Sequence, residues 1–75
     1  MKTYTFTLNM PYAECQDLYA EQIRFVIVRA HTGEKLQLPK ENLKRFLLPN
    51  GLVGHFELKV NAQNKIISLQ KLHIL

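Results

Sequence analysis

The sequence has almost none of the covalent or metal links that stabilise very small proteins. Cys15 is the single cysteine among 75 residues, so a disulfide within the chain is impossible. The histidines His31, His55 and His73 are not at metal-ligand spacing, and no acid stands beside them in a metal-binding pattern. A chain of this length buries only about 60–65% of its unfolded surface, so its core alone is marginal. We expect no metal and no cofactor, and self-association is the stabilising device left open.

Signals for secretion and for a membrane span are also missing from the sequence. The N-terminus does not show charged, apolar and cleavage-site regions in succession, and the longest apolar run, residues 25–28, has only strand length. We therefore expect a soluble cytoplasmic protein that does not contact a membrane. Its length of 75 residues predicts a single domain over residues 1–75.

Residue patterns that carry catalysis are equally scarce. Glycine-rich phosphate loops are missing from the sequence. Cys15 lies on the apolar side of an expected helix, where a thiol acts as a small hydrophobic side chain. On the opposite side, Glu14, Asp17 and Glu21 form a solvated face. We expect no catalytic residues, and hence no enzyme.

Acids are few, and the net charge of +4 is unevenly distributed. Three of the six acids fall within residues 14–21, whereas residues 22–75 carry nine Lys or Arg against three Glu. In a short expected helix, Lys40, Lys44 and Arg45 share one side and are placed to touch phosphates without reading base sequence. The other interpretation is a solvated cationic face that keeps the protein soluble. The whole predicted basic face consists of Arg24, Arg29, Lys35, Lys40, Lys44 and Arg45.

Alternating apolar and polar residues predict five strands, and helical spacing predicts two helices between them. The strands are residues 2–8, 24–30, 34–38, 52–60 and 65–74, and the helices are residues 11–20 and 40–47. In the first helix, Tyr12, Cys15 and Tyr19 form one apolar stripe. The order β-α-β-β-α-β-β predicts an α+β fold with a mainly antiparallel, curled sheet or a small, partly closed barrel. Gly54 within a strand favours a bend in that sheet.

The strand at residues 24–30 is apolar on both of its faces. A turn at residues 31–33, with Gly33 in the left-handed conformation, pairs Ala30 with Glu34. That register directs one face of the hairpin to the core, through Val26, Val28, Leu36 and Leu38. Phe25 and Ile27 then point to the opposite side. A strand that is apolar on both faces is usually central in a sheet or covered.

The C-terminal hairpin stays apolar to the last residue, which favours a final strand packed against something. With a loop at residues 61–64, the register that best matches the alternation pairs Val60 with Lys65, Leu58 with Ile67, and Phe56 with Leu69. The other face is then polar near the turn and apolar near the terminus. We expect that end to be covered either by one of the chain's own helices or by a second subunit. The predicted interface consists of Val53, Ile66, Leu72, Ile74 and Leu75.

A set of positions along nearly the whole chain forms one recognisable pattern. Besides the first strand, Tyr12 and Glu14, it consists of Leu36, Gln37, Leu38, Pro39, Leu43, Phe46, Gly51, Gly54, Phe56, Asn64, Lys65, Ser68 and Leu72. This pattern resembles a small bacterial family of unknown function, domain of unknown function 2835. The resemblance implies a cytoplasmic protein of gammaproteobacteria, and it supplies no activity and no site residue.

Taken with the composition, these features predict a binding module, either a homo-oligomer (most simply a dimer) or an adaptor to a protein partner. The C-terminal hairpin is the expected contact. The alternative is nonspecific RNA or DNA binding through the basic face.

Overall fold

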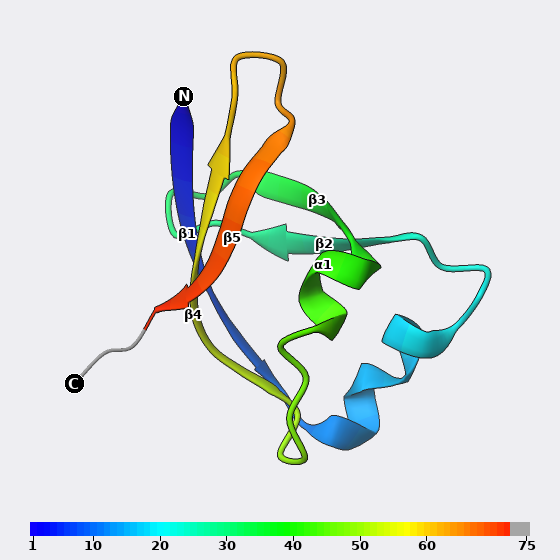
Figure 1. Cartoon of the computed structure of the whole chain (residues 1–75). Helices are drawn as coiled ribbons and strands as arrows, with labels where there is room; N and C mark the ends of the chain where they lie inside the picture. Colours follow the sequence, from blue (N-terminus) through cyan, green and yellow to red (C-terminus); the bar gives the residue numbers. More distant parts are fainter. Residues whose placement is uncertain (73–75) are drawn as a thin grey trace.

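The computed structural model describes residues 1–72 and has the predicted order of elements (Figure 1). The strand and helix bounds are β1 Lys2–Met10, the 3-10 helix η1 Tyr12–Tyr19, β2 Phe25–Arg29, β3 Lys35–Pro39, α1 Lys40–Lys44, β4 Leu52–Val60 and β5 Ile66–Leu72. The second helix is shorter than predicted, because residues 45 and 46 form a turn.

The strands form two antiparallel sheets, which confirms the mainly antiparallel architecture of the predicted α+β fold. One sheet has the order β1-β4-β5, and the other is the β2–β3 hairpin. The hairpin crosses the strands of the larger sheet, with η1 and α1 beside the two (Figure 1). The sheets are separate, so the strands do not close into a barrel.

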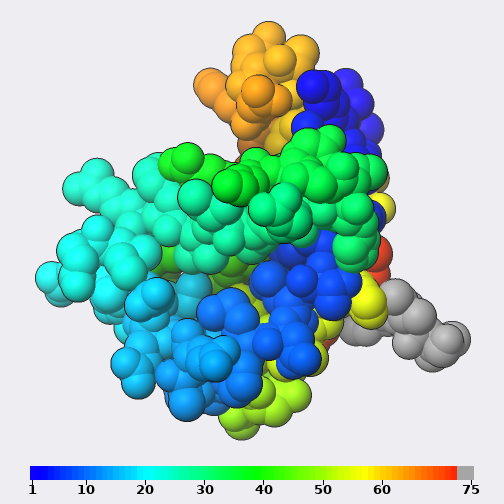
Figure 2. All heavy atoms as spheres, turned by 180° about the vertical axis from the view of Figure 1, so that it is seen from behind, coloured from blue at the N-terminus to red at the C-terminus, as the bar shows by residue number. Residues whose placement is uncertain are grey.

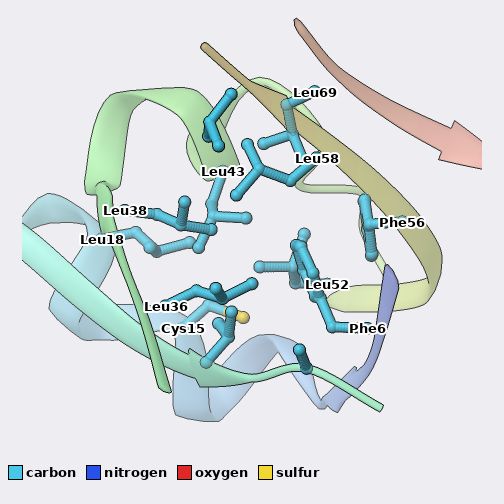
Figure 3. Close-up of a cluster of buried hydrophobic side chains, with 13 residues drawn as sticks. Phe6, Cys15, Leu18, Leu36, Leu38, Leu43, Leu52, Phe56, Leu58 and Leu69 are labelled. Atoms are coloured by element: carbon cyan, nitrogen blue, oxygen red, sulfur yellow. The ribbon is translucent and has the colours of Figure 1, made fainter. Parts of the chain in front are cut away.

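The core lies between the two sheets and the helices (Figure 3). Phe6 of β1 lies directly opposite Phe56 of β4, and their rings stack with centroids 5.4 Å apart. Phe46, which follows α1, meets the Phe56 ring edge-on at 5.3 Å. The buried side chains are Phe6, Cys15, Leu18, Val28, Ala30, Leu36, Leu38, Leu43, Leu52, Phe56, Leu58, Val60 and Leu69.

The β2–β3 hairpin has the predicted register. Ala30 donates its N–H to Glu34 O at 2.8 Å, and Gly33 has the left-handed φ of +102°. Val26 lies opposite Leu38, and Val28 lies opposite Leu36. The inner side of this hairpin therefore packs on the core as expected.

The first helix differs from the prediction in its winding. It is a 3-10 helix, in which about three residues complete a turn and side chains at i and i+3 lie in line. Cys15 and Leu18 therefore point together into the core. The predicted stripe of Tyr12, Cys15 and Tyr19 assumed an α-helix and is wrong, because Tyr12 and Tyr19 are 52% and 54% exposed.

The predicted register of the C-terminal hairpin is also wrong. Val60 lies opposite Ile66 and Lys59 lies opposite Ser68, so Ile67 is an extra residue in β5, as in a β-bulge. Beyond the bulge the pairing is displaced by two residues, which places Leu58 opposite Leu69. As a result Ile67 is 55% exposed, whereas Leu69 is buried as predicted.

Two glycines, Gly51 just before β4 and Gly54 within it, have positive φ angles. Gly51 has a φ of +111° at a tight turn, and a Cβ there would lie 2.1 Å from Met10 O. Gly54 has a φ of +147°, and a Cβ there would lie 2.7 Å from Lys71 Cε. β1 and β4 curve together toward this end of the sheet (Figure 1). The glycine thus leaves room for the Lys71 side chain in the curved part of β4.

Candidate interaction surfaces

The outer side of the β2–β3 hairpin carries the most exposed apolar side chains of any strand pair in residues 1–72. Phe25 is 51% exposed and Ile27 is 66% exposed. The expectation that β2 would be covered is therefore wrong for the described chain, and the hairpin lies uncovered in the view of Figure 2. We call this surface the hairpin face and define it as Phe25, Ile27, Arg29, Lys35, Gln37 and Pro39.

One end of the hairpin face is basic. Arg29 and Lys35 lie directly opposite each other, both exposed. Like charges in this position repel and weaken the sheet. Arg29 Nη1 also donates to Gly33 O at 3.2 Å, a contact that turns its side chain toward the hairpin's own turn. Nothing inside residues 1–72 neutralises the pair through a salt bridge.

The other end of the hairpin face borders an apolar hollow of about 400 Å³ with an acid on its wall. Its apolar lining includes Phe25 and Ile27, and its acidic residue is Asp17 of η1. Glu14 and Glu21 are exposed on and beside the same helix. Asp17 thus lies next to the apolar end of the face, while the Arg29–Lys35 pair forms its basic end.

Three residues of the predicted basic face have contacts with other parts of the chain. Lys40 Nζ donates to Ala20 O at 2.5 Å, and Lys44 Nζ lies 4.7 Å from the centroid of the Tyr19 ring. Arg45 instead reaches β5, where its Nη2 donates to Leu69 O at 2.5 Å.

These three cations therefore connect α1 to η1 and to β5. Arg24 lies beside Lys40, whose backbone N–H donates to Arg24 O at 2.9 Å, whereas Arg29 and Lys35 lie at the far end of the β2–β3 hairpin. Sequence spacing had placed Lys40, Lys44 and Arg45 on one helix face, but α1 ends at Lys44, and each cation has its own contact within the chain.

The predicted C-terminal interface is reduced in residues 1–72 to two half-buried residues. Val53 and Leu72 lie on the outer face of the larger sheet. Ile66 was predicted to join them, but it packs against the core, because the bulge at Ile67 turns it inward. Ile74 and Leu75 lie outside the described residues, as does His73.

The rest of that outer face is polar and is tied to the β2–β3 turn by a small network. Thr7 Oγ1 lies 2.8 Å from His31 Nε2 and 2.9 Å from His55 Nδ1. Thr5 Oγ1 lies 3.0 Å from His31 Nδ1, and His31 N donates to Thr5 O at 2.8 Å. These exposed contacts attach the turn to the edge of β1, a structural role that nothing in the spacing of the histidines had indicated.

A groove runs between α1 and the outer edge of β5. Its volume is about 550 Å³, and its lining, which we call the β5 groove, consists of Asn42, Arg45, Ile66, Ile67, Ser68, Leu69 and Gln70. Sequence reasoning missed it, because the predicted register assigned Ile67 to the core. The only signal in the sequence was the second isoleucine of the pair at residues 66 and 67.

A further hollow of about 360 Å³ opens between β3 and the loop that joins β4 to β5. Tyr4, Gln37 and Asn64 are among its polar lining residues, together with Glu34 and Lys35. The Thr32 hydroxyl donates to Glu34, which holds the pKa of that carboxyl below its ordinary value, with a smaller contribution from the backbone N–H of Glu34 itself. The hollow thus carries charges of both signs, which suits neither a dedicated anion site nor a dedicated cation site.

Within residues 1–72, His, Cys, Asp and Glu side chains do not gather in groups of three that could hold a metal ion. In the same residues, none of the helices has the length and apolar character needed to span a membrane.

A comparison with known protein families gives a match over most of the chain. The family described as "Protein of unknown function (DUF2835)" matches residues 2–72. No curated protein and no solved structure matches the chain.

Proposed function

The chain belongs to the DUF2835 family of proteins of unknown function, and we propose that it is an interaction module that self-associates through its hairpin face. The observation that carries the proposal is the exposure of Phe25 and Ile27, at 51% and 66%, on a strand whose other side is already buried. Exposed apolar residues gathered on one sheet face are a common mark of a protein contact.

Self-association would supply stability that the chain lacks on its own. A two-stranded hairpin is marginal unless it packs against something, and the small core covers only its inner side. Covering Phe25 and Ile27 would contribute roughly 1–2 kcal/mol each, since both are already partly buried.

The distribution of charge favours a second copy as the occupant. The hairpin face is basic at Arg29 and Lys35, and its apolar end borders Asp17. In a two-fold symmetric pair with its axis near Ile27, the basic end of each copy meets the acidic border of the other. The same arrangement keeps the two basic ends apart, so repulsion between the copies is small.

The C-terminal hairpin is the weaker candidate for this contact. Of its predicted interface, residues 1–72 offer Val53 and Leu72 on the outer face, both half-buried, against the more exposed Phe25 and Ile27 of the hairpin face. We therefore assign the contact to the hairpin face. We further propose that the module is not an enzyme and that it acts in the bacterial cytoplasm, where a buried thiol such as Cys15 stays reduced.

The test compares two exposed isoleucines. Ile27→Glu places a charge on the hairpin face, and Ile67→Glu places the same charge on β5, where the starting residue is 55% exposed. Light scattering and sedimentation over micromolar to millimolar concentrations should show a dimer for the unmodified protein and for Ile67→Glu. We expect Ile27→Glu to weaken the dimer by about tenfold or more.

A charge reversal tests the proposed orientation. Asp17→Lys alone, and Arg29→Glu with Lys35→Glu, should each weaken the dimer, whereas combining all three changes should restore it. A protein that is monomeric at millimolar concentration contradicts the proposal. A dimer that Ile27→Glu leaves intact also contradicts it.

Nucleic-acid binding is the second candidate, and one observation favours it. Arg29 and Lys35 lie on the same face of the hairpin as the exposed ring of Phe25, with the Ile27–Gln37 pair between them. Cations and an exposed aromatic ring on one face form the kind of surface that binds single strands without reading sequence. Nucleic-acid binding predicts that the protein binds a labelled oligonucleotide, that the affinity falls steeply as the salt concentration rises, and that the double variant Arg29→Glu with Lys35→Glu does not bind. Failure to bind single-stranded and duplex probes at low salt would remove this candidate and leave the dimer untouched.

A further inference from the structure

β5 has an open edge in the described part of the chain. It lies at the end of the β1-β4-β5 sheet and pairs with β4 alone. The C=O of Leu69 points away from β4, because it accepts a hydrogen bond from Arg45 Nη2 at 2.5 Å. On the opposite edge of the sheet, the β2–β3 turn already occupies Thr5 O. The two edges thus differ, and the edge at β5 borders the β5 groove.

The β5 groove has the length and the walls that an added strand requires. Its lining includes five successive β5 residues, 66–70, which correspond to about 17 Å of extended chain. Asn42 and Arg45 form the wall on the side of α1. Ile67 gives an exposed apolar contact on the strand itself. An open strand edge beside a helix is a recurring arrangement for binding extended peptides.

The charge of the groove selects the partner. Arg45 is the one ionised residue in the lining, and no acid is among those seven residues. Lys71 continues β5, and Lys65 directly precedes it. A second copy paired edge to edge would bring these cations together, whereas an acidic segment would neutralise them.

We propose that the β5 groove binds an extended acidic segment of another protein, which adds to the sheet as a strand beside β5. A backbone N–H of the segment replaces Arg45 as the donor to Leu69 O. The released guanidinium then pairs with a carboxylate of the segment, and the planar fork of Arg suits that pairing. Stacking on Phe46, whose ring centroid lies 4.6 Å from the Arg45 guanidinium carbon, limits how far the side chain moves.

The probe is a fluorescent seven-residue peptide in which valine and glutamate alternate. Lysine replaces glutamate in the first control peptide, and alternate backbone nitrogens are methylated in the second. Fluorescence anisotropy should show that the unmodified protein binds the glutamate peptide at least about tenfold more tightly than either control. Amide resonances of residues 66–71 should shift on addition of the peptide.

Three variants locate the binding. Arg45→Met keeps a long side chain over Phe46 without the charge, and it should weaken the glutamate peptide about tenfold. Ile67→Glu should weaken it further, because the charge repels the peptide and removes the apolar contact. Ile27→Glu should bind like the unmodified protein, so failure of this proposal and failure of the dimer are distinguishable.

Each contrary outcome overturns the proposal. If none of the peptides binds, or if the lysine peptide or the N-methylated peptide binds equally well, the groove is not an acidic strand site. If thermal unfolding shows that Arg45→Met is destabilised, the test is binding of the N-methylated and unmethylated glutamate peptides to the original protein. Equal binding of the two peptides then overturns the proposal. If Ile67→Glu lowers the mass of the protein in sedimentation, the occupant is a second copy.

Discussion

The β2–β3 hairpin and the β4–β5 hairpin both lay one side on the same core, yet their other sides differ. On β4 and β5 the outer positions are mostly polar, with His55, Glu57 and Gln70 among them. On β2 two of the three outer positions are apolar and exposed. β4 has a neighbour on each side, whereas β2 and β3 have only each other. The β4–β5 hairpin is stabilised by β1 and has a mostly polar outer side. The β2–β3 hairpin has no third strand, and its exposed apolar outer side is suited to a partner.

The largest expected effect concerns two glycines, Gly51 in the turn that precedes β4 and Gly33 in the β2–β3 turn. Gly51→Ala directs a methyl group at Met10 O, which a Cβ would approach to 2.1 Å, so backbone must move. Gly33→Ala has the same unfavourable sign of φ but meets nothing within 4 Å. Chemical denaturation should show a loss of about 2–4 kcal/mol for Gly51→Ala and about 1 kcal/mol for Gly33→Ala. Equal losses would mean that the strain of a positive φ determines the cost of both substitutions, and that the contact with Met10 O adds nothing.

The two sides of β2 provide the next test. Val28 is buried and Ile27 is 66% exposed, although they are adjacent in the strand. Val28→Ala should lower the free energy of unfolding by about 1–3 kcal/mol, since it leaves a cavity in the core. Ile27→Ala should change the unfolding of the monomer by less than about 0.5 kcal/mol, yet it should weaken the dimer. Denaturation at low and high protein concentration separates these effects, and a large loss for Ile27→Ala at low concentration would contradict the assignment of its side chain to the outer face.

Much of this contrast could be predicted from the sequence, and the two turns explain why the rest could not. At β2–β3, Gly33 and a three-residue connection leave one reasonable register, so the inner residues and the outward direction of Ile27 were both correct. At β4–β5 the bulge shifts the pairing of the strands, and a single extra residue cannot be recognised from the alternation of apolar and polar residues. The wrong register affected the candidate sites. In the structure Ile66 points inward and Ile67 points outward, and the β5 groove beside Ile67 was not predicted.

The contacts of the predicted basic residues could not be predicted from the sequence for a different reason. Helical spacing shows which side chains share a side of a helix, but it does not show what packs beside that helix. Lys44 lies over Tyr19 and Arg45 reaches β5, so neighbours distant in sequence decide where these charges go. The outer face of β2 is the opposite case. The sequence showed that this face is apolar, and the structure was needed only to show that it is exposed.

The β4–β5 loop should contribute a moderate amount to stability. Asn61 Oδ1 accepts hydrogen bonds from Gln63 N at 2.9 Å and Lys65 N at 3.0 Å, and this holds the loop that precedes the bulge. Asn61→Ala should cost about 1 kcal/mol in denaturation, whereas Asn61→Asp, which keeps the acceptor, should cost less. Amide exchange at residues 66–69 should accelerate in Asn61→Ala. Unchanged exchange there would show that the bulge forms without the loop contacts.

The smallest expected effect lies at the turn of the other hairpin, where the Thr32 hydroxyl donates to Glu34. That bond lowers the pKa of Glu34 in the folded protein, so its stabilising contribution is present above the pKa of the unfolded chain and is lost as the pH falls through the folded value. Thr32→Val should raise the pKa of Glu34 toward its ordinary value in an NMR titration and should flatten the acid dependence of stability. Thr32→Ser keeps the hydroxyl and should leave the pKa low. If both variants titrate like the original protein, the backbone N–H of Glu34, rather than the threonine, sets the pKa, and the β2–β3 turn depends on Gly33 alone.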